Sequence, residues 1–371
     1  MREIADRLRA WHEAGTAYAV ATVVSVGGSA PRRPGAAMAV AADGEAAGSV
    51  SGGCVEGAVY ELCQEAMRTG EAVRESFGYS DDDAFAVGLT CGGTIEVLVR
   101  PGPVPDAALA AVSRDEQVAV VQVMPPAQGV LAVWPDRHEG TTGFADVDRA
   151  VIGEARAMLD GGRTGSISVR CREDLDVFVC SYAPAPRLLV FGAIDHATAV
   201  AGVGKFLGYR VTVCDARPVF ATPARFPAAD EVVVDWPHRY LAAQAERGAL
   251  DGRTVICVLT HDAKFDVPLL EVALRLPVAY VGAMGSRRTH DDRLARLRRT
   301  GLSDRELARL RSPIGLDLGA RTPEETAVAI AAEFVAARRG GTALPLGQTN
   351  GPIHSKRHSH HDRSASASAV A

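Results

Sequence analysis

The stretch RLLVFGA (187–193), with ATAVAGVGKFL (197–207) and YRVTVCD (209–215) after it, decides the fold class of this chain. The first and last of these are short apolar runs of strand length, and the segment between them has the length and apolar spacing of a helix. Further apolar runs of strand length, separated by helix-length segments, are EVVVDW, TVICVLTHD and PVAYVGAMG. Such alternation predicts a parallel sheet covered by helices on both faces, which is a Rossmann-like α/β layout.

The first half of the chain lacks this alternation and divides at a Pro-Gly-Pro run after residue 100. We therefore expect an α/β protein with an N-terminal α+β domain over 1–100 and a middle α+β segment over 101–185 that packs with it. A Rossmann-like domain over 186–339 follows. Residues 340–371 are polar and rich in Gly, Ser and His, a composition typical of disordered segments.

Local patterns predict the elements of the first half. We expect helices over 2–14, 55–69 and 146–159, and strands over 17–26, 36–42, 94–100, 117–124, 129–135, 165–171 and 175–183. In the N-terminal domain, the glycine-rich turns between these elements should converge.

Composition excludes several classes of protein. The net charge of −5 argues against a general nucleic-acid binder, and the arginine-rich run 286–299 fits the exposed face of a helix. The seven cysteines are odd in number and lack the short spacings of secreted proteins, so reduced thiols are expected. No signal-peptide pattern and no run of ~18 apolar residues occur. We expect a cytoplasmic protein that binds neither nucleic acid nor membrane.

Two cysteines stand beside glycine pairs, in SGGCVEG (51–57) and TCGGT (90–94). Glycine pairs permit positive φ and leave backbone N–H groups free to face an anion. Cys54 would lie just before the helix over 55–69, whose dipole favours the thiolate. These motifs predict a site for a soft atom beside an anionic group, made by Gly52, Gly53, Cys54, Cys91, Gly92 and Gly93. The alternative is two small buried cysteines in tight turns.

A third glycine-rich turn, GGSAPRRPG (27–35), offers donors for a phosphate. Its candidates are the hydroxyl of Ser29 and the guanidinium groups of Arg32 and Arg33. Proline on either side of the two arginines stiffens the turn. The alternative is that both arginines are simply exposed to solvent.

The first turn of the Rossmann-like half departs from the dinucleotide fingerprint G-x-G-x-x-G. Gly192 occupies the first glycine position, but the branched side chain of Ile194 replaces the second, where a phosphate would lie, and Asp195 adds a negative charge beside it. Asp215 ends the second strand, at the position of a ribose-binding acid. NAD(P) binding is therefore not expected. Other candidates for ligand contact at strand ends are His261, Gly285 and Ser286.

Several segments together resemble the XdhC/CoxI family. SVGGSAPRRPGAAMAV, GSVSGGCVEGAVYE and GLTCGGTIEVLV resemble its N-terminal domain, and RLLVFGA, GYRVTVCDARPVFATPARFPAADEVVV, LTHDAKFDVPLLEVAL, YVGAMGSRRT and SPIGLDLGARTPEETAVAIAAEF resemble its C-terminal Rossmann domain. The family's strand turn usually reads G-A-G-H, whereas this chain has Ile194 and Asp195 at the last two positions.

This resemblance implies an accessory factor for a molybdenum hydroxylase of the xanthine dehydrogenase or carbon monoxide dehydrogenase type. Such a factor binds molybdenum cofactor transiently, assists its sulfuration and inserts it into the apoenzyme, without turning over a substrate of its own. A sulfurtransferase of the cysteine desulfurase type would be a second partner, and a homodimer is left open. Cys54 and Cys91 would then lie close to molybdenum. The alternative is an NAD(P)-dependent oxidoreductase that uses the Rossmann-like domain.

Overall fold

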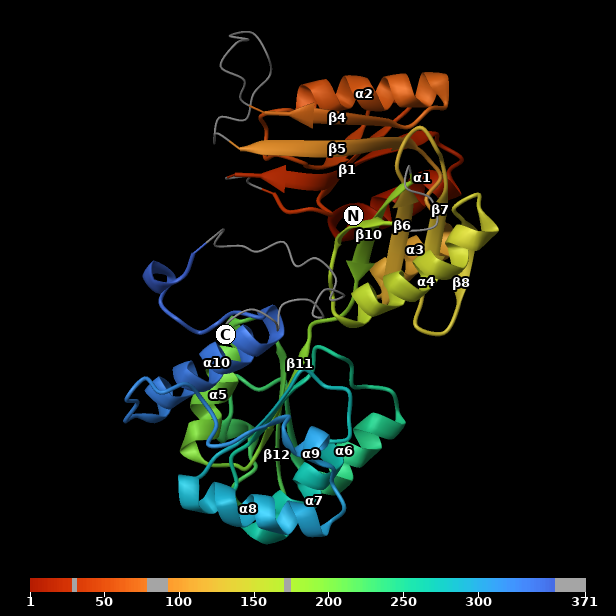
Figure 1. The fold of residues 1–371 in the computed structure, drawn as a ribbon. Coiled ribbons are helices and arrows are strands. Elements are labelled where there is room, and N and C mark those ends of the chain that lie inside the picture. Colours follow the sequence, from red (N-terminus) through yellow and green to blue (C-terminus); the bar gives the residue numbers. More distant parts are fainter. Residues whose placement is uncertain (29–31, 79–92, 170–174, 351–371) are drawn as a thin grey trace, which may run out of the picture. The chain divides into compact units, whose positions relative to one another are not determined.

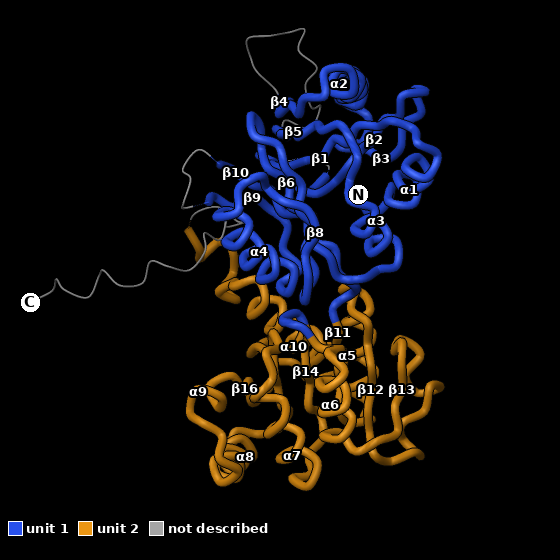
Figure 2. Tube along the Cα trace, turned by 90° about the vertical axis from the view of Figure 1, so that its right-hand side faces the viewer, with its two compact units in different colours: residues 1–186, 251–253 blue, residues 187–250, 254–371 orange. Residues whose placement is uncertain are grey.

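The computed structural model describes residues 1–28, 32–78, 93–169 and 175–350. The chain forms two compact units (Figure 2). The first comprises residues 1–186 together with Asp251–Arg253, and the second comprises the rest of the chain from Arg187. Asp251–Arg253 belong with the first unit because Gly252 N donates to Asp160 Oδ1 and Arg253 Nη1 donates to the Pro184 carbonyl, at 2.9 and 2.8 Å.

An antiparallel sheet with strand order β3-β2-β1-β5-β4 carries the first part of this unit (Figure 1). Its strands are β1 (Tyr18–Gly27), β2 (Ala37–Ala41), β3 (Ala46–Gly48), β4 (Val73–Phe77) and β5 (Thr94–Pro101). Ala19, Ala21 and Val23 of β1 pack against helix α2 (Glu56–Thr69). Val20 and Val24 point to the opposite face, where they pack with α1 (Ala5–Glu13), which follows the short 3-10 helix η1 (Arg2–Ile4).

A second antiparallel sheet, of order β8-β7-β6-β10-β9, completes the first unit. Its elements are α3 (Asp106–Ser113), β6 (Val118–Val123), β7 (Val130–Val133), β8 (His138–Thr141), α4 (Ala145–Asp160), β9 (Gly165–Ser168) and β10 (Asp176–Tyr182). One face of β6 packs with α3 in the same core as α1 and β1, and its other face packs with α4. Neither α3 nor the strands β3, β4 and β8 were expected from the sequence.

The second unit has the predicted parallel sheet, with order β13-β12-β11-β14-β15-β16. Its strands are β11 (Arg187–Phe191), β12 (Arg210–Asp215), β13 (Glu231–Val234), β14 (Val255–Val258), β15 (Tyr280–Ala283) and β16 (Leu310–Arg311). Leu188 and Val190 face α5 (Asp195–Phe206) and α10 (Pro323–Arg339). Leu189 and Phe191 face the opposite layer, which contains α6 (Pro237–Glu246), α7 (Ala263–Ala273), α8 (Arg287–Arg299) and α9 (Asp304–Leu307). The Rossmann-like prediction is confirmed.

Short 3-10 helices complete the second unit: η2 (Pro223–Arg225) and η3 (Leu346–Gln348). The segment 351–371, which holds most of the histidine-rich tail, lies outside the described residues. Within the ranges that are described, none of the helices has both the length and the apolar character needed to cross a bilayer.

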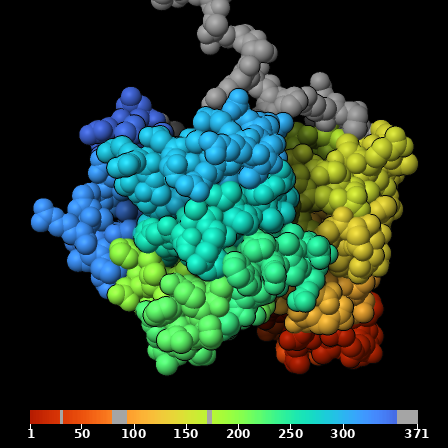
Figure 3. Space-filling view, turned by 90° about the horizontal axis from the view of Figure 1, so that it is seen from below, coloured from red at the N-terminus to blue at the C-terminus, as the bar shows by residue number. Residues whose placement is uncertain are grey.

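The arginine-rich helix α8 differs from expectation at one position. It lies on the surface of the second unit, where Figure 3 shows its segment in light blue. Arg293, however, is only 4 % exposed, and its guanidinium pairs with the buried carboxylate of Asp266 at 2.9 Å. The expectation that the whole run is a solvated face is therefore wrong at Arg293.

Candidate functional site

The three glycine-rich segments of the first unit leave its first sheet at the same end. β1 ends at Gly27, which pairs with Thr94 at the start of β5, so Gly93 lies beside the turn that follows β1. β2 starts at Ala37 at this same end of the sheet. Gly48, the last residue of β3, pairs with Met38, which is the neighbour of Ala37 in β2. The SGGC loop begins at Ser51 and follows Gly48 after Ser49 and Val50. Within the described residues, the three glycine-rich segments thus share one end of the sheet. Their convergence into one site stays a prediction, because Ser29, Cys91 and Gly92 lie outside the described residues.

A single carboxylate, that of Glu56, organises the SGGC loop. Its oxygens accept hydrogen bonds from five backbone N–H groups: Val50 at 3.2 Å, Ser51 at 2.9 Å, Gly52 at 3.0 Å, Gly53 at 2.8 Å and Val55 at 3.2 Å. The hydroxyls of Ser49 and Ser51 donate to it as well, at 2.6 and 2.5 Å. Burial alone would raise the pKa of Glu56, but the hydrogen bonds from Ser49 and Ser51 outweigh it and hold that pKa well below its usual range.

This arrangement corrects one part of the sequence interpretation. The N–H groups of Gly52 and Gly53 do face an anion, but that anion is the protein's own side chain. They therefore do not present free donors to the phosphate of a ligand. Both glycines have positive φ, +86° and +123°, which explains why the loop needs them.

Glu56 is part of the SGGCVEG motif, but the predicted site does not include it. The signal was available, because Glu56 is the first residue of a helix and closely follows a glycine pair. Acidic side chains are favoured at that position by the N–H groups of the first helical turn.

The loop fixes the backbone of Cys54 at the start of α2. Its N–H donates to Ser51 Oγ at 3.0 Å, and Val55, the next residue, caps the helix. The thiol is half-buried, unlike Cys63, Cys180, Cys214 and Cys257, which are buried. Burial raises the pKa of Cys63 to about 12. Among the described cysteines, Cys54 is therefore the one that a ligand can reach most easily.

Arg32 is joined to the same loop. Its Nη2 donates to Glu3 Oε2 at 2.6 Å and to the carbonyl of Ser49 at 3.5 Å. Arg33 is exposed. The alternative of simple solvent exposure therefore describes Arg33 and not Arg32. Arg32 contacts Ser49, whose hydroxyl donates to Glu56.

The second unit gathers its own set of candidates. These residues lie along the carboxyl edge of one parallel sheet. Asp215 is the last residue of β12, and Gly192, His261 and the Gly285-Ser286 pair come after β11, β14 and β15. Gly192 has φ +112°, and a Cβ there would lie 2.9 Å from Thr260 N. Ser286 caps α8 by accepting the N–H of Thr289 at 3.1 Å. Packing and capping thus account for both residues.

Asp215 is occupied by partners within the protein. Its carboxylate accepts from Arg217 Nε and Nη2 at 2.9 and 2.8 Å, and from Ala193 N at 2.8 Å. Burial alone would raise the pKa of Asp215, but hydrogen bonds from Arg217 and Ala193 outweigh it and lower that pKa. A ribose hydroxyl would have to displace Arg217 from Asp215. The Ala193 N–H already donates to Asp215, so it is not available to bind a pyrophosphate.

We expect NAD and NADP to bind only at millimolar concentration, and Ile194→Gly to raise that weak affinity. Glycine would remove the branched side chain from the position where the backbone must approach the pyrophosphate. Titration calorimetry measures the effect, with Ile194→Val as a control that keeps the branch. Micromolar affinity in the unmodified protein would contradict this prediction.

A buried network supports the same edge of the sheet. Asp266 on α7, 3 % exposed, receives hydrogen bonds from Thr260 and from Arg293, whose Nη2 also donates to the Met284 carbonyl at 2.8 Å. Burial raises the pKa of Asp266, and its contacts with Thr260 and Arg293 oppose that rise. The network connects the ends of β14 and β15 to two helices, so it holds the His261 and Gly285 turns in place.

Comparison with known proteins agrees with this two-part architecture. Residues 11–78 match the XdhC and CoxI family, and residues 188–334 match the XdhC Rossmann domain. The chain is 26% identical over 336 residues to a Bacillus subtilis protein described as a probable xanthine dehydrogenase subunit, covering 86% of this chain and 93% of the relative. It is 27% identical over 326 residues to the molybdenum cofactor insertion chaperone PaoD of Escherichia coli, covering 87% and 84%.

A solved structure shares the fold. The crystal structure of a xanthine dehydrogenase from Bacillus halodurans aligns with a TM-score of 0.55 and 24% identity, over 91% of this chain and 96% of that one.

Proposed function

Since this chain belongs to the XdhC and CoxI family, we propose that it is an accessory factor that binds molybdenum cofactor and delivers it to a molybdenum hydroxylase. Similarity to an insertion chaperone over 87% of the chain supports the cofactor role. The relative described as part of a xanthine dehydrogenase supports a client of that class. The cofactor is cargo: it is held while its terminal sulfido ligand is installed and then passed to the apoenzyme.

The observation that carries this proposal is the half-buried thiol of Cys54 on a loop that Glu56 fixes and Arg32 contacts. Molybdenum cofactor is a pterin with a dithiolene-bound metal and a terminal phosphate. A thiolate suits the soft metal–sulfur end, and a guanidinium suits the phosphate. The thiol of Cys54 would thus suit one end of the cofactor and the guanidinium of Arg32 the other, and both residues lie on loops at the same end of the first sheet.

The remaining assignments extend this proposal. Cys91 with Gly92 and Gly93, and Ser29 in the neighbouring turn, would complete the cofactor site around Cys54. A sulfurtransferase of the cysteine desulfurase type would supply the sulfur, and self-association as a homodimer is open to measurement. The contact between Asp215 and Arg217 argues against the alternative of an NAD(P)-dependent oxidoreductase.

Replacing Cys54 or Cys91 by alanine should lower the amount of bound cofactor about tenfold, which corresponds to about 1.4 kcal/mol of binding free energy. The thiol supplies a soft ligand that alanine lacks, while the Glu56 contacts that hold the Cys54 loop remain. The measurement is the fluorescence of oxidised pterin released from purified protein, together with activation of a client apoenzyme.

Cys63→Ala serves as the matched control, because Cys63 is a buried thiol on the helix that the Cys54 loop precedes. It should keep full cofactor loading. Full loading and client activation in both Cys54→Ala and Cys91→Ala would show that these thiols are packing residues and that the site lies elsewhere.

A further inference from the structure

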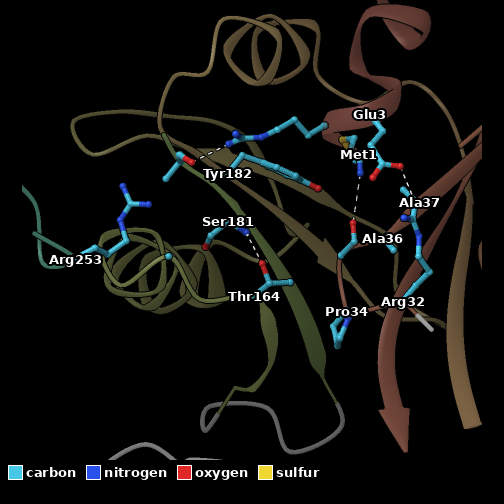
Figure 4. A pocket seen from close by; sticks show the side chains of 14 residues that line it. Met1, Glu3, Arg32, Pro34, Ala36, Ala37, Thr164, Ser181, Tyr182 and Arg253 are labelled. Carbon is cyan, nitrogen blue, oxygen red and sulfur yellow. Dashed lines mark hydrogen bonds and ion pairs between the residues drawn. The ribbon is translucent and has the colours of Figure 1, made fainter. Parts of the chain in front are cut away.

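The first unit contains a cavity of about 340 Å³ that is lined on one side by the turn at Arg32. Figure 4 shows Arg32, Pro34 and Ala36 on one side of it, and Thr164, Ser181 and Tyr182 on the other. The cavity therefore lies between the turn before β2 and the second sheet, where the ends of β9 and β10 meet. Its volume is within the range of small-molecule sites.

The lining of this cavity is basic. It contains three guanidinium groups, of Arg2, Arg32 and Arg253, and one carboxylate, of Glu3. Arg2 is held by Asp115 and the Ala183 carbonyl, and Arg253 by Asp251 and the Pro184 carbonyl. Arg32 is the least committed of the three, since the hydrogen bonds found for it within the described residues use only Nη2.

Three enclosed polar atoms of the lining have no hydrogen-bond partner of normal geometry among the described residues: Arg32 Nε, Ser181 Oγ and Tyr182 Oη. Tyr182 is 8 % exposed, and the thiol of Cys180, a weak hydrogen-bonding group, lies beside its hydroxyl. In Figure 4 the ring of Tyr182 extends from β10 toward Ala36. Because buried polar groups are nearly always paired, three orphans around one cavity point to a partner that the polypeptide does not supply.

The chemistry of these orphans defines that partner. A guanidinium N–H can only donate, and both hydroxyls can donate. A ligand group that accepts several hydrogen bonds and carries negative charge would suit each of them once its side chain turns toward the cavity. We infer that the cavity binds the phosphate group of a small phosphorylated molecule, with Arg32 turning from Glu3 to the anion. The guanidinium fork suits two phosphate oxygens, which lysine would contact less well.

Two sources of this phosphate group can be told apart. Arg32 also contacts Ser49 of the Cys54 loop, so the cofactor's own phosphate is the source that the geometry favours. If the phosphate is that of the cofactor, the inference rests on the proposed function. Binding of inorganic phosphate to the same residues does not depend on it.

Calorimetric titration of the full chain separates these cases with three probes: inorganic phosphate, a pterin carrying a phosphate monoester, and the same pterin without phosphate. We expect the phosphorylated pterin to bind, the dephosphorylated one to bind about tenfold more weakly, and inorganic phosphate to compete with the former. Arg32→Lys, Ser181→Ala and Tyr182→Phe should each weaken phosphate binding severalfold. Ser168→Ala, an exposed serine on β9, should not.

Thermal unfolding distinguishes a ligand site from a structural role. Because the Ser181 and Tyr182 hydroxyls lack a normal partner within the described residues, Ser181→Ala and Tyr182→Phe should keep or raise Tm while binding falls. Unchanged binding in all three variants, or no binding of either phosphate probe at millimolar concentration, would overturn the inference. If Cys54→Ala loses cofactor while these variants do not, the proposed function stands and the cavity assignment fails. If phosphate binds through Arg32 but the pterin adds nothing, the cavity assignment stands and the cofactor role weakens.

Discussion

Removing either member of the buried Asp266–Arg293 pair should lower the free energy of unfolding of the second unit by about 3 to 5 kcal/mol. Arg293→Met leaves the carboxylate of Asp266 buried without its counter-ion. Asp266→Asn likewise leaves the guanidinium of Arg293 buried without a counter-ion. Both side chains are almost fully enclosed, so water cannot replace the lost partner. Urea denaturation measures the loss, and hydrogen exchange over β14 and β15 assigns it to this unit.

The matched control is Arg296→Met on the same helix. Arg296 pairs with Asp292 at 3.1 Å, but the two side chains are 51% and 65% exposed. Removing that pair should cost less than about 1 kcal/mol. The double variant Asp266→Leu with Arg293→Met should cost less than the sum of the single changes, because it leaves no unpaired charge. Equal small effects for Arg293→Met and Arg296→Met would show that the buried pair contributes little.

The sequence predicts the second unit more completely than the first. The inner strands of the parallel sheet, β11, β12, β14 and β15, are buried on both faces, so each appears as a continuous apolar run that is easy to recognise. The missed strand β4 has the opposite character, since Arg74, Glu75 and Ser76 are exposed at a sheet edge. Helix α3 is missed because its alanine-rich stretch is buried almost all round and shows no polar face.

Contacts between distant residues explain what could not be foreseen at the candidate sites. The arginine-rich helix looked uniformly solvated, although Arg293 precedes the buried Leu297 by four residues and so shares its face. Its carboxylate partner lies on another helix, beyond the reach of a local pattern. The cavity likewise joins the turn at Arg32 to Ser181 and Tyr182, which are far along the chain. Local motifs located the glycine-rich turns, but only the fold shows that the SGGC turn faces the carboxylate of Glu56.

Glu56→Gln should lower the free energy of unfolding of the first unit by about 2 to 3 kcal/mol. Glutamine keeps one acceptor oxygen, but its NH2 group would face the N–H groups of Gly53 and Val55, which now donate to the second oxygen. Water can satisfy part of this deficit because Gly52 and Gly53 are exposed, which limits the loss. Glu61→Gln on the same helix, an exposed position, is the control and should change stability by less than about 0.5 kcal/mol.

The pH dependence of this loss identifies its cause. The pKa of Glu56 is lowered in the folded protein, so its carboxylate stabilises the fold above the unfolded-state pKa of about 4.3. That contribution disappears as the pH falls from about 5 toward the lower folded-state pKa. The stability difference between the unmodified protein and Glu56→Gln should therefore shrink in acid. A gap for Glu56→Gln that does not change with pH would mean that lost packing, and not lost charge, is responsible.

The same variant tests whether the loop positions the thiol. Cys54 N–H is held by Ser51 Oγ, and the hydroxyl of Ser51 donates in turn to Glu56. Glu56→Gln leaves the Cys54 side chain unchanged, yet it should reduce cofactor loading severalfold at neutral pH because the loop is no longer fixed around one anion. Cys54→Ala should lose loading with little loss of stability, so the two variants separate contact from positioning. Normal loading in a clearly destabilised Glu56→Gln protein would show that the cofactor does not depend on the geometry of this loop.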